Sequence, residues 1–426
     1  MTVFIFIYAS HIPIMDITVV GAGYVGLTTG VAFAELGNNV RLIDIDKEKI
    51  EKIRKGIAPI YEEGLQEMLQ RNMDRIKATT TYNEIDDIVF VCVGTPSLPD
   101  GSINLSYVKE AVENAARNME EGIIVIKSTV FPGTTEKILR PIAEKYSNKI
   151  SLAMNPEFLR EGKALHDFMH PDRIVIGARD EKTAEMLKEL YKPIDAPILV
   201  TNPTVAELIK YASNAFLATK ISFANEIGNL AKLLGIDVYE VMKGVAMDHR
   251  ISPYFLNAGI GFGGSCFPKD LKALRAGAKK LGYDMRLIDA VLKINEEQPL
   301  RLLKILEKYV ELEGSIIAIL GLAFKANTDD VRESRAIPII KELLKRGAKI
   351  KAYDPMAMEN MKKIFPEIEY CNSIEKAIEN ADACLILTDW KEFEEINFDA
   401  MKRKIVIEGR RILKNKEGII YEGVCW

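Results

Sequence analysis

A glycine-rich turn between an apolar run and a helical run constrains the fold of this 426-residue chain more than any other feature. Residues 17–20 are mostly β-branched, the turn reads Gly-Ala-Gly-Tyr-Val-Gly at 21–26, and a helical pattern continues to Leu36. Glycines at this spacing permit a tight turn, a close approach of a pyrophosphate to the backbone, and close packing of helix on strand. The helix N-terminus then faces the phosphates. The pattern predicts the first unit of a parallel α/β sheet that binds a dinucleotide.

An acidic residue closes the next apolar run. Residues 40–43 predict a second strand, and Asp44 follows it directly. A carboxylate at this place accepts hydrogen bonds from the ribose hydroxyls and repels a 2′-phosphate, which favours NAD over NADP. The glycine turn alone is a weak signal, but together with the strand, the helix and the acid it is a strong one. We therefore expect NAD as the cofactor.

Further apolar runs predict the rest of this sheet, at residues 87–93, 122–127, 151–154, 174–177 and 196–200. Ligands in open α/β sheets lie outside the carboxyl ends of the strands. Thr95 and Thr129 follow two of these strands and are candidate contacts for a cofactor or a substrate, although either could be a helix N-cap or a turn residue. For Thr134 and Thr135 we expect that simpler role.

Two glutamates follow the strand predicted at 151–154. Glu157 and Glu161 are four residues apart, so a helical segment would place both carboxylates on one face. Such a pair usually forms a solvated surface. Its position at the end of a strand also makes it a candidate for general-base work or for positioning a water molecule.

Residues 203–234 show an unbroken helical pattern that Pro203 can begin and Gly235 ends. A helix of this length is a spine of about 45 Å at 1.5 Å per residue, and it offers a surface for a dimer. Lys210 and Asn214 share one face of it. A surface lysine beside a polar partner is the simpler interpretation of that pair.

The strand pattern restarts near residue 315. Runs at 315–320, 348–354 and 381–388 predict a second sheet, and residues 381–388 echo residues 85–92. The C-terminal part is thus predicted to be a degenerate copy of the N-terminal unit. Its first turn has Lys325 instead of the glycine motif, so we expect no second NAD site there, but a lysine suits a phosphorylated ligand. Arg332 and Arg335 follow among acidic residues, where they could equally form a solvated ion-pair patch.

A cysteine lies within the stretch Gly-Phe-Gly-Gly-Ser-Cys-Phe-Pro-Lys-Asp at 261–270. The glycines permit close approach of a ligand, and a thiolate favoured by a nearby ammonium can act as a nucleophile. An isolated cysteine is more often a small buried apolar residue. The surrounding pattern makes Cys266 the candidate nucleophile.

The bulk composition excludes several classes of protein. The net charge is −4 with no basic block, so nucleic-acid binding is not indicated. The five cysteines are widely spaced without a Cys-x-x-Cys pair, and with only four histidines neither a metal centre nor a disulfide framework is expected. A reducing cytoplasm fits this pattern. Residues 1–14 are too short to span a membrane and lack a positive n-region. We expect them to be a dispensable extension, with translation starting at Met15.

These blocks together resemble the UDP-glucose/GDP-mannose dehydrogenase family from Met15 almost to the C-terminus. The matching blocks are residues 21–27, 93–96, 127–130, 155–162, Lys210 with Asn214, 261–270, 321–325 and 329–334. Glu408 departs from the Asp-Gly-Arg usual in the family. The resemblance implies two Rossmann-like parallel-sheet domains joined by a long central helix and a small helical dimerisation domain. Its expected parts are the extension at 1–14, an NAD-binding domain at 15–200, a central domain at 201–300, and a UDP-binding domain at 301–426. A homodimer is implied as well.

The implied reaction is an NAD-dependent four-electron oxidation of UDP-glucose to UDP-glucuronate through a thiohemiacetal and a thioester on Cys266. Lys210 and Asn214 would stabilise the oxyanion, Asp270 would orient or activate the hydrolytic water, and Glu161 and Thr129 would position water or act as a base. Another nucleotide sugar, such as GDP-mannose or UDP-N-acetylmannosamine, is the alternative substrate. A two-electron hydroxyacid dehydrogenase or a non-catalytic nucleotide-sugar sensor would not need these groups.

The resemblance also assigns the binding residues. Those implied for NAD are Gly21, Gly23, Tyr24, Val25, Gly26, Asp44, Lys49, Thr95, Thr129, Glu161, Lys269 and Arg332. Those implied for the nucleotide sugar are Glu157, Phe158, Leu159, Arg160, Lys210, Asn214, Arg250, Phe255, Gly263 and Lys325, with Arg250 reaching a substrate across the dimer.

Overall fold

The computed structural model describes residues 13–426, so nearly all of the extension predicted at residues 1–14 lies outside the described residues. The chain divides into two compact units. Unit 1 holds the residues up to Leu98 together with residues 103–210, and unit 2 holds residues 99–102 and 211–426.

Unit 1 is built on an eight-stranded sheet with the order β3-β2-β1-β4-β5-β6-β7-β8. Most of its strands are short and apolar, as expected for strands that are covered on both faces, whereas the edge strand Ile198–Thr201 exposes Leu199 and Val200. They are β1 Asp16–Val20, β2 Asn39–Ile43, β3 Ile76–Thr79, β4 Ile88–Val91, β5 Gly122–Ile126, β6 Ile150–Met154, β7 Ile174–Gly177 and β8 Ile198–Thr201. The predicted sheet is confirmed with two corrections. Strand β3 was not predicted, and β6 and β7 pair antiparallel through Met154 and Gly177.

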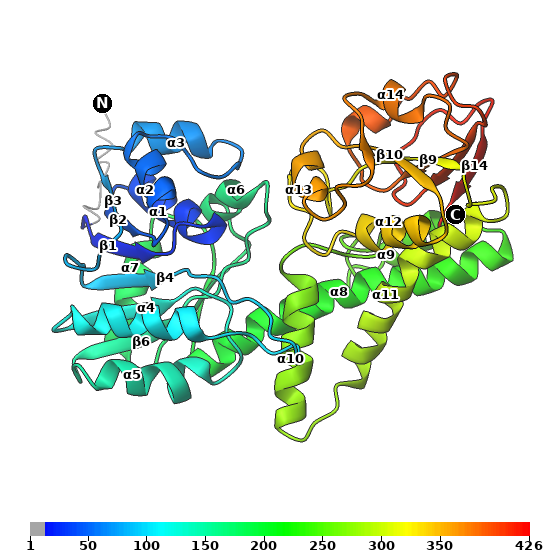
Figure 1. Cartoon of the computed structure of the whole chain (residues 1–426). Helices are drawn as coiled ribbons and strands as arrows, with labels where there is room; N and C mark the ends of the chain where they lie inside the picture. Colours follow the sequence, from blue (N-terminus) through cyan, green and yellow to red (C-terminus); the bar gives the residue numbers. More distant parts are fainter. Residues whose placement is uncertain (1–12) are drawn as a thin grey trace, which may run out of the picture. The chain divides into compact units, whose positions relative to one another are not determined.

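Helices pack on this sheet and bury its apolar faces (Figure 1). They are α1 Tyr24–Glu35, α2 Lys47–Arg54, α3 Leu65–Arg71, α4 Ser106–Arg117, the π-helical turn Thr135–Leu139, α5 Arg140–Glu144, α6 Ala164–Met169 and α7 Glu181–Tyr191. Helix α1 is buried along most of its length. Its Phe33 ring packs against the rings of Phe90, Phe168 and Tyr191, which join β4, α6 and α7 to α1.

Helix α8 spans Pro203–Leu234, with the bounds predicted from the sequence. Asn202 accepts a hydrogen bond from the backbone N–H of Val205, and Pro203 occupies the first turn, where its missing N–H costs nothing. Gly235 ends the helix with a φ of +69°, a conformation that glycine adopts without strain. The helix begins in unit 1 and continues into unit 2.

Unit 2 contains a six-stranded sheet with the order β11-β10-β9-β12-β13-β14, and all its pairs are parallel. The strands are β9 Ile316–Leu320, β10 Lys349–Tyr353, β11 Glu369–Tyr370, β12 Ala383–Ile386, β13 Ile405–Glu408 and β14 Ile420–Gly423. The order of the first five strands repeats that of β3-β2-β1-β4-β5, which confirms the predicted degenerate copy. Strands β11, β13 and β14 were not predicted.

The helices of unit 2 are α9 Val238–Ala246, α10 Phe267–Lys280, α11 Arg286–Leu306, α12 Ala336–Lys345, α13 Met358–Lys362, α14 Ile374–Ile378 and the 3-10 turn Lys391–Phe393. Helices α10 and α11 are separate, because α10 ends at Lys280 and the chain turns at Gly282 with a φ of +78°. In the described part of the chain, no helix combines the length and apolar character needed to cross a membrane.

Candidate active site

The glycine turn after β1 leaves room for a ligand at one glycine and none at another. Gly21 has a φ of +94°, and a Cβ on Gly26 would lie 1.7 Å from the Gly21 carbonyl oxygen. A Cβ on Gly23, by contrast, would meet no atom within 4 Å. Helix α1 begins at Tyr24 without a capping side chain at Gly23, so the positive end of its dipole is left for an anion. These residues fit the pyrophosphate of NAD.

Asp44 lies beside this turn at the carboxyl end of β2. Its Oδ2 accepts a hydrogen bond from the Ala22 N–H at 2.7 Å, and its Oδ1 accepts one from Asp46 N–H at 2.9 Å. Lys49 on α2 donates to Oδ2 at 3.2 Å. The structure thus brings together the acid, the lysine and the glycine turn, in the arrangement that a ribose next to a pyrophosphate requires.

The ends of β4 and β5 are adjacent because these strands are neighbours in the sheet. Ser128 Oγ donates to the Val93 carbonyl at 2.7 Å and so joins the two loops. Thr95 and Thr129 follow these strands, with Thr95 buried and Thr129 half-buried. Thr134 Oγ1 donates to the Phe131 carbonyl, which is the turn role expected for it.

Lys210 and Glu157 form a buried ion pair in unit 1. Lys210 Nζ donates to Glu157 Oε1 at 2.8 Å, and both side chains are buried. Burial alone would raise the pKa of Glu157, but the charge of Lys210 and its hydrogen bond outweigh burial and hold that pKa below its usual value. The interpretation of Lys210 as a surface lysine is therefore wrong.

The segment at 155–162 is not helical, so Glu157 and Glu161 do not share a helix face. Glu157 Oε2 accepts a hydrogen bond from Leu159 N–H at 2.6 Å, which folds the backbone back on the side chain in a tight turn. Glu161 lies beyond this turn and is half-buried. Arg160 is exposed and pairs with Asp167 at 2.6 Å.

The Phe158 ring lies close to two cations. The Arg173 guanidinium is 3.8 Å from its centroid and Lys210 Nζ is 5.5 Å from it. A face so close to a guanidinium supports cation–π attraction, which fixes the ring beside the Lys210–Glu157 pair.

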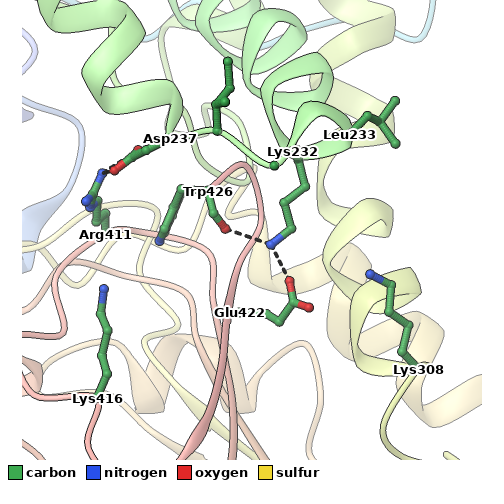
Figure 2. Close-up of a pocket in the computed structure, with 10 residues that line it drawn as sticks. Lys232, Leu233, Asp237, Lys308, Arg411, Lys416, Glu422 and Trp426 are labelled. Carbon is green, nitrogen blue, oxygen red and sulfur yellow. Dashed lines mark hydrogen bonds and ion pairs between the residues drawn. The ribbon is translucent and has the colours of Figure 1, made fainter.

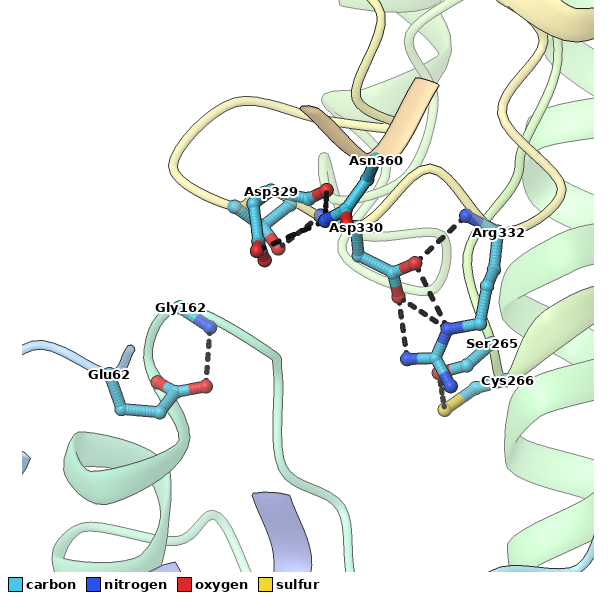
Figure 3. A network of polar contacts seen from close by, with 9 residues as sticks. Glu62, Gly162, Ser265, Cys266, Asp329, Asp330, Arg332 and Asn360 are labelled. Atoms are coloured by element: carbon cyan, nitrogen blue, oxygen red, sulfur yellow. Dashed lines mark hydrogen bonds and ion pairs between the residues drawn. The ribbon is translucent and has the colours of Figure 1, made fainter. Parts of the chain in front are cut away.

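Two buried glutamates that the sequence did not single out anchor loops near these residues. Glu62 accepts hydrogen bonds from the Gly162 and Ala164 N–H groups at 2.8 and 3.1 Å, directly after Glu161 (Figure 3). Glu207 on α8 accepts from the Gly133 and Thr135 N–H groups and from Thr135 Oγ1. Glu62 is followed by a second glutamate and Glu207 lies in a helical run, and their partners are distant in the sequence, so no local pattern marks either as buried.

Cys266 is exposed, whereas the other four cysteines are buried, and none of the five is in a disulfide. It is the N-cap residue of α10, without a side-chain cap. A helix N-terminus stabilises negative charge on a group placed there. Ser265 Oγ lies 3.6 Å from its Sγ, and Figure 3 shows the two side chains next to each other. The one exposed thiol of the chain is therefore the one predicted to be the nucleophile.

Asp270 lies one turn after Cys266 and is fully buried. Its Oδ2 accepts a hydrogen bond from Asn214 Nδ2 at 2.7 Å, and its Oδ1 accepts one from Lys269 Nζ at 2.6 Å. The backbone N–H of Asp270 also donates to the Cys266 carbonyl. Three predicted site residues from two helices thus form one chain of contacts beside the cysteine.

The cysteine loop packs against the loop at 324–335. Gly264 N–H donates to the Arg332 carbonyl at 2.9 Å, and a Cβ on Gly263 would lie 2.4 Å from the Glu333 carbonyl oxygen. The Arg332 guanidinium is held by both oxygens of Asp330 (Figure 3). Gly263 is required here by the close approach of another backbone, which differs from the expectation that it leaves room for a sugar.

The first turn of the second sheet differs in chemistry from the glycine turn of unit 1. Lys325 is half-buried there, with its Nζ 5.5 Å from the Phe324 ring centroid. Asp354, the counterpart of Asp44, is fully buried and accepts five hydrogen bonds, from Leu322, Ala323, Met356 and Ala357 N–H and from Trp390 Nε1. Asp354 therefore braces its own turn.

Arg250 and Phe255 lie between α9 and the cysteine loop. Arg250 is exposed and forms an ion pair with Asp248. Phe255 has a φ of +63°, and its ring centroid is 6.1 Å from that of Phe267, the residue after Cys266. A bulky residue in this backbone region is strained, and such strain persists only where the surroundings impose it.

Unit 2 also has an open cleft of about 630 Å³ at the end of α8 (Figure 2). Lys232 donates to Glu422 and to the Trp426 carbonyl, and Arg411 pairs with Asp237. Lys308 and Lys416 also line it. None of the lining residues is a predicted site residue.

The two Rossmann-like sheets, the first carrying a dinucleotide-binding turn with its acidic partner, define an NAD-dependent dehydrogenase. The segments of the chain match three models of one family in order. They are the NAD binding domain at residues 15–195, the central domain at 204–297 and the UDP binding domain at 318–415. The chain belongs to the UDP-glucose/GDP-mannose dehydrogenase family.

Relatives of known name match over nearly the whole chain. UDP-glucose 6-dehydrogenase AglM of Haloferax volcanii is 46% identical, over 96% of this chain and all of that protein. YwqF of Bacillus subtilis, also named UDP-glucose 6-dehydrogenase, is 46% identical over 93% of each chain. A UDP-glucose dehydrogenase structure from Pyrobaculum islandicum superposes with a TM-score of 0.94 at 43% identity, covering 98% of this chain and 99% of that one. A UDP-D-ManNAc dehydrogenase from Pyrococcus horikoshii gives 0.87 at 32% identity, with coverage of 96% and 99%.

Proposed function

We propose that this protein oxidises UDP-glucose to UDP-glucuronate with two molecules of NAD. The observation that carries the proposal is Cys266, an exposed thiol at the N-terminus of α10 beside the buried Asn214–Asp270 pair. A simple alcohol dehydrogenase needs no nucleophile, whereas oxidation to an acid without release of the aldehyde does. The likeness to proteins named UDP-glucose 6-dehydrogenase supports the choice of sugar.

NAD accepts a hydride at each of the two oxidation steps. Between them, the Cys266 thiolate adds to the C6 aldehyde and forms a C–S bond in a thiohemiacetal. Loss of the second hydride leaves a thioester. Water then attacks the thioester carbon, the C–S bond breaks, and the carboxylate and the thiolate are released. Per sugar the reaction consumes one water and releases three protons.

The neighbouring groups take roles that their chemistry allows. Lys210, held by Glu157, and Asn214, held by Asp270, donate to the developing oxyanion. Asp270 orients or activates the hydrolytic water, and Glu161 with Thr129 positions water or takes a proton. Thr95, Glu161, Lys269 and Arg332 contribute to the NAD site together with the glycine turn, Asp44 and Lys49.

The sugar nucleotide is bound by residues 157–160, Arg250, Phe255, Gly263 and Lys325 in this proposal. Gly263 acts by permitting the loop at 324–335 to approach the cysteine loop. The proposed domains are residues 15–200 for NAD, 201–300 for the cysteine loop and the dimer surface, and 301–426 for the UDP moiety. Five free thiols fit a reducing cytoplasm, and a homodimer through α8 completes the proposal.

Counting NADH per sugar tests the proposal. Purified protein is given NAD and UDP-glucose, and NADH and UDP-glucuronate are both quantified. Two NADH per UDP-glucuronate are expected. One NADH with free aldehyde would exclude the four-electron reaction. In a Cys266→Ser variant, release of the acid should be lost, and unchanged turnover would remove Cys266 from the mechanism.

A different nucleotide sugar is the second candidate substrate. The likeness to a UDP-D-ManNAc dehydrogenase, at a TM-score of 0.87, favours it specifically. The same assay with UDP-N-acetylmannosamine and GDP-mannose decides between them. A kcat/KM for either sugar above that for UDP-glucose would replace UDP-glucose as the substrate.

A further inference from the structure

Lys127 is a buried lysine to which the proposed mechanism gives no role. It follows β5 directly, and its side chain is only 4% exposed. Its Nζ donates to Asn155 Oδ1 at 2.8 Å and lies 3.5 Å from Tyr191 Oη. The Phe168 ring centroid is 5.8 Å away. The ammonium is thus enclosed by one amide, one phenol and one aromatic ring.

No carboxylate lies within ion-pair distance of Lys127 among the described residues. A buried charge without a counter-ion is costly, because its few hydrogen bonds do not replace the hydration that it loses. Burial is the main cause that lowers the pKa of Lys127 to about 8; the Lys210 charge acts in the same direction, and Cys92 and Glu157 act in the opposite one. Such a lysine changes charge near neutral pH.

Lys127 is connected to Glu157 through Asn155. The Asn155 side chain accepts from Lys127 and from Tyr191 Oη at 2.6 Å, and its Nδ2 donates to the Val175 carbonyl. Its backbone N–H donates to the Ile126 carbonyl. Asn155 therefore joins β5, β7 and α7 at the point where the chain leaves β6 and turns to Glu157. A shift of Asn155 moves the carboxylate that holds Lys210.

The titratable groups that face Lys127 come from every element packed around it. Cys92 follows β4, Glu157 follows β6, Tyr191 ends α7, and Lys210 lies on α8. Burial raises the pKa of the Cys92 thiol to about 12 and raises that of Tyr191, so both stay neutral near pH 8. Glu157 is ionised, since its pKa is lowered. Of Lys127, Cys92, Tyr191 and Glu157, Lys127 is the group that titrates there.

We propose that Lys127 is a positioning residue for the dehydrogenase reaction: it holds Asn155, and through it Glu157, and its positive charge supports the Glu157–Lys210 pair that stabilises the oxyanion. This inference rests on the proposed function of Lys210. When Lys127 loses its proton, the cluster loses one positive charge, and transition-state stabilisation falls. The turnover number should therefore decline as pH rises through the titration of Lys127.

The experiment compares wild type with Lys127→Met from pH 6 to 10 and follows kcat and both KM values. At pH 6.5 the variant should lose about tenfold in kcat with KM values within about twofold, because Lys127 is buried and its ammonium contacts protein groups. The ratio of wild-type to variant kcat should then fall at least threefold by pH 9.5. The midpoint of this fall should lie near the pH at which Lys127 loses its proton. Lys149→Met, the same change at an exposed site before β6, should leave kcat unchanged at every pH.

Two further variants separate charge from hydrogen bonding. Lys127→Arg keeps a charge that is not lost below pH 12, so its kcat should not show the alkaline decline. Tyr191→Phe removes one hydrogen bond to Asn155 without changing any charge, so its smaller loss should be independent of pH. If the ratio of wild-type to Lys127→Met kcat did not change with pH, Lys127 would have only a structural role, and the proposal would be overturned.

Wild-type turnover reports on the proposed function separately. Equal kcat for wild type and Lys127→Met, in an active enzyme, contradicts the role of Lys127 alone. An inactive wild type contradicts the proposed function. In that case the free energy of unfolding still tests the titration: wild type should gain stability relative to Lys127→Met as pH rises from about 8 towards 10, and parallel curves would refute the buried, titrating lysine.

Discussion

At the scale of single residues, the five cysteines differ in exposure far more than their sequence contexts suggest. Cys266 is exposed at a helix N-terminus, and burial raises the pKa of Cys92 and of Cys425 to about 12 and also raises that of Cys371 and Cys384. Thiolates react with alkylating reagents, whereas thiols do so slowly. The structure therefore separates one reactive thiol from four inert ones.

Iodoacetamide should modify one cysteine in the native protein and five after unfolding in guanidinium chloride. Intact mass spectrometry counts the added groups, and peptide mapping should place the first at Cys266. Cys384→Ser serves as the matched control and should leave the native count at one, while Cys266→Ser should reduce it to zero. If the native protein added two or more carbamidomethyl groups at the same rate, the burial of the other four cysteines would be contradicted.

Glu157→Gln should destabilise the protein strongly, because it removes the buried carboxylate that pairs with the buried Lys210 ammonium. A loss of about 3 kcal/mol in the free energy of unfolding is expected, measured by urea titration at pH 7. The folded-state pKa of Glu157 is lowered, so the stability it contributes is present above its unfolded pKa of about 4.3 and is lost as pH falls through the lower folded value.

The exposed pair of Glu189 with Lys192 supplies the control. Glu189→Gln should cost less than about 0.5 kcal/mol, since exposed ion pairs contribute little. The difference between Glu157→Gln and Glu189→Gln in lost unfolding free energy should be smaller at pH 3 than at pH 7. Equal costs at pH 7 would mean that the Glu157–Lys210 pair is solvated, contrary to its burial.

The pairing of these residues could not be predicted from the sequence, although most of the residues themselves were. Glu157 lies 53 residues from Lys210, and Asn214 lies 56 residues from Asp270. The spacing of residues in the sequence gives information only on neighbours along one helix or strand. From that spacing alone, Lys210 was interpreted as a surface residue. Glu62 and Glu207 escaped notice for the same reason, because their partners are backbone N–H groups far along the chain.

At the scale of elements, the accuracy of prediction follows the strength of local signals. Helix α8 was predicted to the residue because Pro203 and Gly235 mark its ends and its pattern is long. The turn at Glu157 was missed because it depends on a side chain bonding its own backbone. The antiparallel direction of β7 was also missed, since an apolar run carries no information on direction.

Glu207 connects two elements and provides a test at this scale. It ties α8 to the loop after β5, accepting from Gly133 N–H, Thr135 N–H and Thr135 Oγ1. Glu207→Ala leaves these donors unpaired in the interior and should cost about 3 kcal/mol, whereas Glu207→Gln keeps one acceptor and should cost about half as much. Denaturant unfolding measures both. Because the loop also carries Thr129, the KM for NAD should rise more in the alanine variant. If both variants lost the same small amount of unfolding free energy, the conformation of the loop after β5 would not depend on Glu207.

At the scale of the whole molecule, the chain uses one strand order twice and specialises each copy at corresponding positions. Asp44 accepts hydrogen bonds from two backbone N–H groups and from Lys49 beside an open glycine turn, whereas Asp354 accepts five, from four backbone N–H groups and the Trp390 indole. The duplication could be predicted from the sequence, because residues 381–388 resemble residues 85–92. The sequence could not reveal the use of Asp354, because both acids follow a strand in the same way.

The exposed apolar face of α8 carries the prediction for assembly. Phe216, Phe223 and Leu230 recur every seven residues on one side of the helix and are 66%, 47% and 53% exposed. Monomeric proteins rarely expose such a row of large apolar side chains. A second copy of the chain, related by a two-fold axis, would bury this face against itself.

Phe223→Asp should therefore convert a dimer of about twice 47.7 kDa into a monomer, as measured by sedimentation equilibrium. The charge would have to be buried twice in a two-fold interface, once from each copy, which costs several kcal/mol. Ile364→Asp makes the same kind of change at an exposed residue after α13 and should leave the dimer intact. A wild-type monomer at micromolar concentration would exclude the interface, and a dimer that survives Phe223→Asp would place it on another face of the chain.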